Sequence, residues 1–226
     1  MSSDDTRARI LNAAGPVFAE KGFQAATVRD ICQDAGVNLA SVNYYFGDKE
    51  RLYIETVKCA HQLRADQVHL PDWAPGTAPE NKLHDFVLTM ITRMIGVQAA
   101  PWQLQLMMRE TLNPTSACRE LVQEAFRPHF EVLLSILDEM VPESMPPHRR
   151  HQIAFSVVGQ CLHYHVAGEV VALLVPDQAE LQTHYSPVEL AEHISSFCLA
   201  ALGRRPPLVE SKLTHPRGTG ARVSQH

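Results

Sequence analysis

The chain has 226 residues, 45% of them hydrophobic and 20% charged, with a formal net charge of −5. This balance is typical of a soluble globular protein with a sizeable core, and no apolar run reaches the roughly 18 residues of a membrane span. The polar start MSSDDTRAR is unlike a secretory signal, and five widely spaced cysteines without a CxxC pair favour free thiols in a reducing cytoplasm over disulfides or a zinc site.

The first part of the chain predicts three helices. An amphipathic helix is expected over residues 6–21, with Gly22 ending it. The stretch Thr27 to Phe46 then predicts two short helices joined by a tight turn. Thr27 and Asn38 are placed to cap their N-termini, and Gly36 suits a turn with positive φ. This pattern is typical of a helix-turn-helix, whose second helix enters the DNA major groove.

The rest of the chain also favours helices, and no strand alternation persists. Asp48 is expected to begin a helix over residues 48–70, which Pro71 stops, and residues 71–80 form a loop with three prolines. Further helices are expected over residues 80–99, 101–112, 116–140 (capped by Ser116 and kinked or divided by Pro128), 147–174 and 187–202. Residues 203–226 lack a core-forming pattern and are expected to be disordered.

Residues 6–60 resemble the TetR/AcrR family of bacterial transcription regulators. The likeness rests on KGF at the end of the first helix, on TVRDICQDAGVN and on NYYFGDKERLY. Asn43 stands where the family commonly has a tyrosine. That NYYF form and the later GQCLHYHVAG segment are more similar to the CecR-type branch.

The resemblance implies an all-α fold, with an N-terminal three-helix helix-turn-helix DNA-binding domain and a larger C-terminal helical domain for ligand binding and dimerisation. The expected division is a DNA-binding domain at 1–50, a connecting helix at 51–70, an effector-binding and dimerisation domain at 71–202 and a basic tail at 203–226. The expected partners are a double-stranded DNA operator, a small-molecule effector and a second copy of the chain, with no membrane and no cofactor. The family's usual mode is repression that the effector relieves.

The second helix of the motif carries most of the predicted DNA contacts. Leu39 and Ala40 suit thymine methyl groups, and Asn43 suits a bidentate contact with adenine. Hydroxyl groups and helix starts suit phosphates. The full predicted set is Thr27, Arg29, Asn38, Leu39, Ala40, Ser41, Asn43, Tyr44, Tyr45 and Lys49. The alternative is that the aromatic residues belong to the core, which we expect for Phe46 and also for Val42.

The charge distribution restricts how this motif works. Residues 1–60 contain 7 Lys/Arg against 8 Asp/Glu, residues 61–202 contain 8 against 16, and residues 203–226 contain 5 against 1. A near-neutral segment binds DNA when its cations face the phosphates and its acids face away. One copy is therefore expected to bind weakly, which favours a dimer.

Two further residue sets follow from the implied C-terminal domain. A methionine-rich pocket lining, adaptable because methionine repacks easily, is predicted from Met90, Arg93, Met94, Trp102, Met107, Met108, Phe126 and Gln160, with Arg109 as another polar anchor. Dimer contacts are predicted at Val158, Leu162, Val166, Leu190, Ile194, Phe197 and Ala201, because the helix over 147–174 is apolar on several sides and the final helix carries an apolar stripe. The alternative is that the lining residues are ordinary core and surface.

A rival function rests on Cys161, His165 and Glu169, which are spaced i, i+4, i+8 and are therefore expected on one helix face. A thiol–imidazole pair or a metal site there would suit a small helical enzyme or an adaptor. Such a face more often lines a pocket or a dimer interface, so no catalytic or metal residue is predicted. Neither rival accounts for Thr27 to Phe46.

Overall fold

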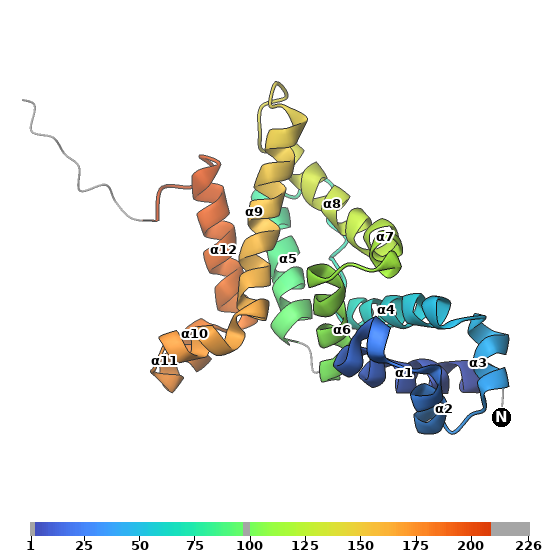
Figure 1. The fold of residues 1–226 in the computed structure, drawn as a ribbon. Coiled ribbons are helices and arrows are strands. Elements are labelled where there is room, and N and C mark those ends of the chain that lie inside the picture. Colours follow the sequence, from blue (N-terminus) through green and yellow to red (C-terminus); the bar gives the residue numbers. More distant parts are fainter. Residues whose placement is uncertain (1–2, 97–99, 209–226) are drawn as a thin grey trace, which may run out of the picture.

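The computed structural model describes residues 3–96 and 100–208, and within these ranges it consists of helices and their connections (Figure 1). The N-terminal group comprises α1 (Ser3–Ala25), α2 (Val28–Ala35), α3 (Leu39–Phe46) and α4 (Lys49–Ala65). In α1 the helical path is interrupted at Gly22, whose φ of 74° is left-handed, so the first helix changes direction where the sequence predicts its end.

Local capping builds the turn between α2 and α3 as the sequence predicts. The Thr27 hydroxyl accepts a hydrogen bond from the Asp30 amide (3.1 Å), and Asn38 Oδ1 accepts one from the Ser41 amide (2.9 Å). Gly36 lies at the end of α2 with φ 62°. The helix-turn-helix is therefore encoded within its own residues.

The connecting helix α4 begins as expected but ends early. Asp48 Oδ1 accepts from the Arg51 amide (2.7 Å), whereas the helix stops at Ala65 instead of continuing to Pro71. No large apolar side chain occurs between Leu63 and Val68, so another turn would bury nothing against the protein. The prediction of a helix to residue 70 was wrong for this reason.

The helices of the larger group follow a loop that ends at Pro79. They are α5 (Pro79–Ile91), α6 (Pro101–Leu112), α7 (Ser116–Leu121), α8 (Arg127–Asp138), α9 (Pro147–Val166), α10 (Gly168–Leu174), α11 (Gln178–His184) and α12 (Pro187–Ala201). The side chain of Thr115, rather than the predicted Ser116, caps α7 by accepting from the Ala117 amide (3.2 Å). Helix α11 lies in a segment that the sequence predicted as a loop.

Two π-helical turns interrupt the regular helices. The first, η1 (Thr92–Gly96), continues α5, and the second, η2 (Val122–Phe126), joins α7 to α8. Pro128 has no amide hydrogen, and its ring crowds the carbonyl of Glu124 inside η2. The predicted disturbance at Pro128 therefore takes the form of a π-turn within a continuing helical path.

The long helix predicted over 147–174 is broken. Helices α9 and α10 meet at Ala167 with a bend of 75°, and α10 and α11 project from the lower end of α9 in Figure 1. Gly168 adds no side chain that could hold the two segments in line. Among the described residues no single helix is long and apolar enough to cross a membrane, and only this bent pair passes that test jointly.

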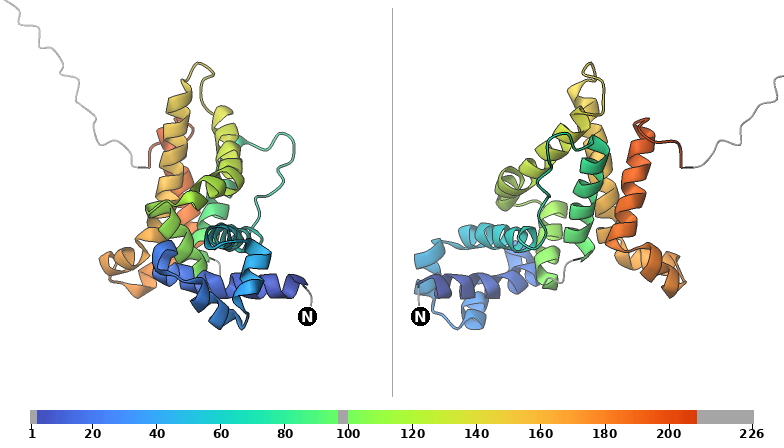
Figure 2. Two further views of the ribbon diagram at one scale, coloured as in Figure 1. Left: turned by 45° about the vertical axis from the view of Figure 1, so that its right-hand side comes forward. Right: turned by 180° about the vertical axis from the view of Figure 1, so that it is seen from behind.

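Buried apolar side chains form two clusters. The first joins α1–α4 to the later helices through Leu106, Ala117, Leu121 and Ala125. The second is centred on α5, α8, α9 and α12. Helix α4 packs against α1, α6 and α7 (Figure 2). Helix α4 is therefore placed to link the two groups of helices. The expected domain boundaries remain a prediction. Residues 209–226 of the predicted tail lie outside the described residues.

Candidate DNA-binding surface

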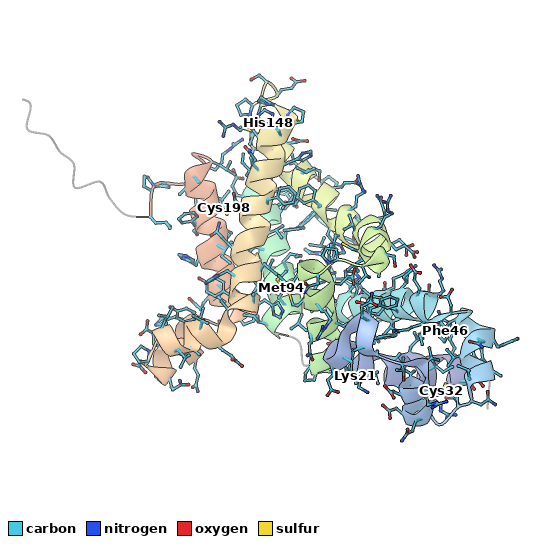
Figure 3. The ribbon with its side chains drawn as sticks, in the orientation of Figure 1. Lys21, Cys32, Phe46, Met94, His148 and Cys198 are labelled. Carbon is cyan, nitrogen blue, oxygen red and sulfur yellow. The ribbon has the colours of Figure 1, made fainter. Side chains whose placement is uncertain are left out.

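Helix α3 has a buried face and an exposed face. Val42 and Phe46 are buried in the first cluster, as the sequence predicted. Figure 3 labels Phe46 among the side chains of the N-terminal helices. Leu39, the first residue of α3, is 56% exposed, and Tyr44, opposite the buried pair, is 81% exposed, which is unusual for such large apolar or aromatic side chains. Asn43 is exposed next to Tyr44. An apolar side chain, an amide and an aromatic hydroxyl are thus exposed on one short helix.

Other predicted contact residues have partners within the chain. Asn38 and Thr27 serve as caps, and the Ser41 hydroxyl donates to Asn38 Oδ1 (3.0 Å). Tyr45 is half-buried against the first cluster and meets Tyr44 edge to face at 5.0 Å between ring centroids. These residues support the geometry of α3, whereas Ala40 and Arg29 are exposed.

Most N-terminal cations have partners within the chain, although several are exposed. Arg7 pairs with Glu55 (2.8 Å), Arg9 donates to the Ala35 carbonyl (2.6 Å), and Lys21 pairs with Asp30 (2.8 Å). Arg51 and Lys58 pair with acidic residues of α4, α7 and η2. These cations are therefore only partly available to neutralise phosphates.

Lys49 has a role that the sequence did not indicate. Its ammonium donates to the Gln24 carbonyl (3.2 Å) and lies 4.8 Å above the centroid of the Phe23 ring. It therefore fastens the start of α4 to the end of α1. Arg29, by contrast, is exposed and makes no ion pair or hydrogen bond with the other described residues, so its guanidinium is accessible to a phosphate.

The predicted pocket residues are divided between the two clusters. Trp102 packs so closely against α1 that a Cβ added at Gly15 would lie 2.5 Å from its ring. Trp102 and Phe126 adjoin the first cluster, whereas Met90 and Met94 adjoin the second. Met107 and Met108 are half-buried on α6. The eight residues therefore do not all converge on one place, because α6 packs on α1.

The polar residues of that set have different surroundings. Arg93 donates from Nε to the Val68 carbonyl (2.7 Å) and bonds through Nη1 to His129 Nε2 (2.6 Å). Gln160 Nε2 donates to Cys198 Sγ (3.3 Å) in a groove between α9 and α12. Arg109 donates to the carbonyls of Ala19 and Glu20 at the end of α1, so it fastens α6 to α1. Its role as a pocket anchor remains a prediction.

The predicted dimer residues also separate into two kinds. Leu190 and Ile194 are buried in the protomer's own core against α5, so a partner cannot reach them and their assignment needs correction. Val158 and Leu162 are half-buried, and Ala201 is exposed. Phe197 and Val166 are 50% and 55% exposed, respectively. These five remain accessible on α9 and α12.

The chemistry proposed for Cys161, His165 and Glu169 loses its geometric basis. The bend at Ala167 places Glu169 on α10, away from the face of α9. Cys161 is buried, and burial, followed by the nearby Cys198 thiol, raises its pKa to about 12. It is therefore a thiol at neutral pH and a poor nucleophile. Within residues 3–96 and 100–208, no group of three His, Cys, Asp or Glu is placed to hold a metal ion.

Sequence reasoning missed a buried carboxylate that joins three helices. Glu110 on α6 is 0% exposed, and it accepts from the Tyr53 hydroxyl (2.7 Å) and the Thr115 amide (2.6 Å). Burial and this carboxylate raise the pKa of Tyr53. The available signal was its spacing, since Gln103, Leu106 and Glu110 lie on the buried face of α6.

Two family models match the chain. The model of the bacterial regulatory proteins of the TetR family matches residues 10–56, and that of the C-terminal domain of the HTH-type transcriptional dual regulator CecR matches residues 79–202. CecR of Shigella flexneri is 22% identical over 76% of this chain and 81% of its own length. UidR of Escherichia coli K12, another HTH-type transcriptional regulator, is 38% identical over 26% of this chain and 30% of its own length.

Solved structures share the fold. A TetR-like transcriptional regulator from Rhodococcus sp. RHA1 is 19% identical with a TM-score of 0.61, covering 88% of this chain and 97% of that chain. AibR, solved with isovaleryl coenzyme A and operator DNA, is 14% identical with a TM-score of 0.61, covering 85% and 97%. The expected all-α architecture is thus confirmed, and the relatives are regulators rather than enzymes. The chain belongs to the TetR family of DNA-binding transcriptional regulators, with a C-terminal domain of the CecR type.

Proposed function

We propose that this regulator binds a palindromic operator as a homodimer, represses transcription there and leaves the DNA when a small molecule binds the larger helical group. The exposure of three side chains of α3, Leu39, Asn43 and Tyr44, is the observation that carries the proposal. These side chains have no role in the protomer's core. They suit base methyl groups, adenine edges and phosphates.

The outer face of α9 and α12 supports pairing of two copies. A groove of about 420 Å³ on this face is lined mostly by apolar residues, including Ile153, Phe197 and Ala201. Phe197, which lines this groove, is 50% exposed. A large exposed apolar patch is typical of a protein–protein interface. A two-fold pair would carry two copies of α3 and double the modest phosphate contacts of one copy.

Helix α4 supplies the link that a ligand-dependent switch requires. Arg7 of α1 holds it through Glu55, and Glu110 of α6 holds it through Tyr53. Lys58 pairs with Glu124 of η2 (2.6 Å). A shift of the larger group would therefore move α4 and the adjoining α3. The effector acts only if it prefers the arrangement that does not bind DNA. AibR, whose structure contains both a coenzyme A ester and operator DNA, supports this mode by likeness of fold alone.

Replacing Asn43 by alanine tests the role of α3. We expect the variant to lose about 1–3 kcal/mol of operator binding free energy and to relax the preference at one base position, because a bidentate amide contact disappears. Base preference is measured by enriching bound sequences from a random pool of DNA duplexes, and operator binding free energy by titrating the operator with protein. Asn81→Ala, at an exposed position on α5, is the matched control and should change neither the base preference nor the operator binding free energy. An unchanged base preference in Asn43→Ala would remove Asn43 from base recognition.

A further inference from the structure

Three nitrogen-bearing side chains from separate segments meet beside the end of α4. His61 comes from the C-terminal half of α4, Arg93 from η1 and His129 from α8. The His61 and His129 ring centroids are 6.1 Å apart, and Arg93 Nη1 is 2.6 Å from His129 Nε2. Phe126 of η2 adjoins the group, with its ring centroid 6.2 Å from that of His61. We call His61, Arg93 and His129 the basic cluster.

The hydrogen bonds fix the chemical state of His129. Its Nδ1 donates to the Ala125 carbonyl (2.9 Å), so its Nε2 is the atom that accepts from Arg93. This pattern requires a neutral imidazole. Burial, and secondarily Arg93, lower the pKa of His129, which agrees with that assignment. Two of the hydrogen bonds of Arg93 therefore go to neutral acceptors, the His129 imidazole and the Val68 carbonyl.

His61 shows that the surroundings disfavour additional positive charge. Burial, followed by His129 and Arg93, lowers its pKa to about 4. Among the described residues His61 donates and accepts no hydrogen bond, so its imidazole nitrogens remain for a ligand. The groups that face it are His129 from α8, Arg93 from η1 and the Phe126 ring from η2. A half-buried cation beside two neutral imidazoles favours an anion, because charge-assisted bonds are stronger than those to a carbonyl or imidazole.

The backbone around the cluster also departs from regular helix. Arg93 lies within η1, and the carbonyl that holds His129 belongs to Ala125 within η2. Single π-turns inside α-helices occur frequently at functional sites. Here each of the two turns positions one member of the same cluster.

We propose that the basic cluster is the anion-binding part of the effector site and that it receives the carboxylate or phosphate of an amphipathic ligand, with the apolar part beside Phe126. This inference rests on the proposed ligand-responsive function. The anion takes the Arg93 hydrogen bonds that Val68 and His129 now accept. It also stabilises protonated imidazole, so binding takes up protons from solvent and strengthens as the pH falls toward 6. Because His61 belongs to α4, occupancy acts directly on the helix that adjoins α3.

Thermal unfolding of the full chain with three C8 probes tests this site. Octanoate carries a carboxylate, octyl phosphate carries a phosphate monoester, and octanamide has the same tail without charge. At saturation we expect at least one anionic probe to raise the melting temperature by about 3 °C or more, and octanamide not to. The anionic probe that raises the melting temperature shows whether the site prefers a carboxylate or a phosphate. For octanoate, the increase should be larger at about pH 6 than at about pH 8.

Variants locate the effect. Arg93→Gln and His61→Gln should lose the increase, and Arg93→Lys, which keeps the charge without the planar fork, should retain part of it. Circular dichroism first establishes that each variant is folded. Arg149→Gln is the matched control, since Arg149 is exposed and lines a different groove, and it should respond as the unaltered protein does.

Several results would overturn the basic cluster as an anion site. They are no increase with either anion, an equal increase with octanamide, an increase that survives in Arg93→Gln and His61→Gln, or an increase lost only in Arg149→Gln. Because melting requires no DNA, a failure here is distinguishable from a failure of the proposed function. An anion response without any preferred DNA sequence would retain the site and refute the operator-binding role.

Discussion

Replacing Glu110 by alanine should lower the free energy of unfolding by about 3 kcal/mol, because the change leaves buried donors without an acceptor. The Glu110 carboxylate accepts from the Tyr53 hydroxyl and from both the amide and the hydroxyl of Thr115. These groups belong to α4 and to the start of α7, while Glu110 itself lies on α6. The variant should therefore loosen the packing of α4 as well as reduce overall stability.

Urea unfolding followed by circular dichroism measures this loss. Glu131→Ala is the matched control, because Glu131 is exposed and its ion pair with Arg127 is long, at 4.0 Å. This variant should change the free energy of unfolding by no more than about 0.5 kcal/mol. Tyr53→Phe removes one donor and leaves the carboxylate with its Thr115 bonds, so about 1 kcal/mol is expected. If Glu110→Ala were as mild as Glu131→Ala, Glu110 would not be the link between α4, α6 and α7 that the geometry indicates.

Replacing Phe197 by glutamate should separate the two protomers and weaken operator binding about 100-fold or more. An uncompensated charge in an apolar interface costs about 3–5 kcal/mol, and every 1.4 kcal/mol is about tenfold in affinity. Phe197 is half exposed on α12 and lines the groove between α9 and α12, so the glutamate disturbs the protomer's own core little. Each protomer would then bind the operator through its own α3 alone, with few cations available to contact the DNA phosphates.

Sedimentation and operator titration of the same samples measure the two effects. The matched control is Val188→Glu, because Val188 is 60% exposed on the same helix. It lies nine residues before Phe197, about two and a half turns, and therefore on the opposite side of α12. This control should remain dimeric and bind the operator normally. A Phe197→Glu variant that sediments as a dimer would place the interface on another face.

The helix-turn-helix was predictable because its determinants are local. Thr27, Gly36 and Asn38 act on residues within a few positions of themselves, and Val42 and Phe46 follow helical spacing. The family models confirm the resemblance that rested on the same residues. Caps and spacing of this kind require no knowledge of the rest of the fold.

The larger group was less predictable because its determinants are distant in sequence. Apolar spacing alone does not distinguish Trp102, which meets Gly15 on α1, from Met94, which adjoins the other cluster. It also does not show that α9 ends before Gly168, since apolar residues continue on both sides of the break. Packing partners decide these features, and the sequence does not reveal them one segment at a time.

Selection of genomic fragments bound by the full chain, followed by footprinting and determination of the protein mass on the selected site, tests the central claim most directly. The account predicts one enriched inverted repeat, occupied by two protomers, with half-site centres about 34–36 Å apart, one turn of DNA. A single protomer on an asymmetric site, or no enriched sequence, would contradict the account that α3 recognises DNA as one of a symmetric pair.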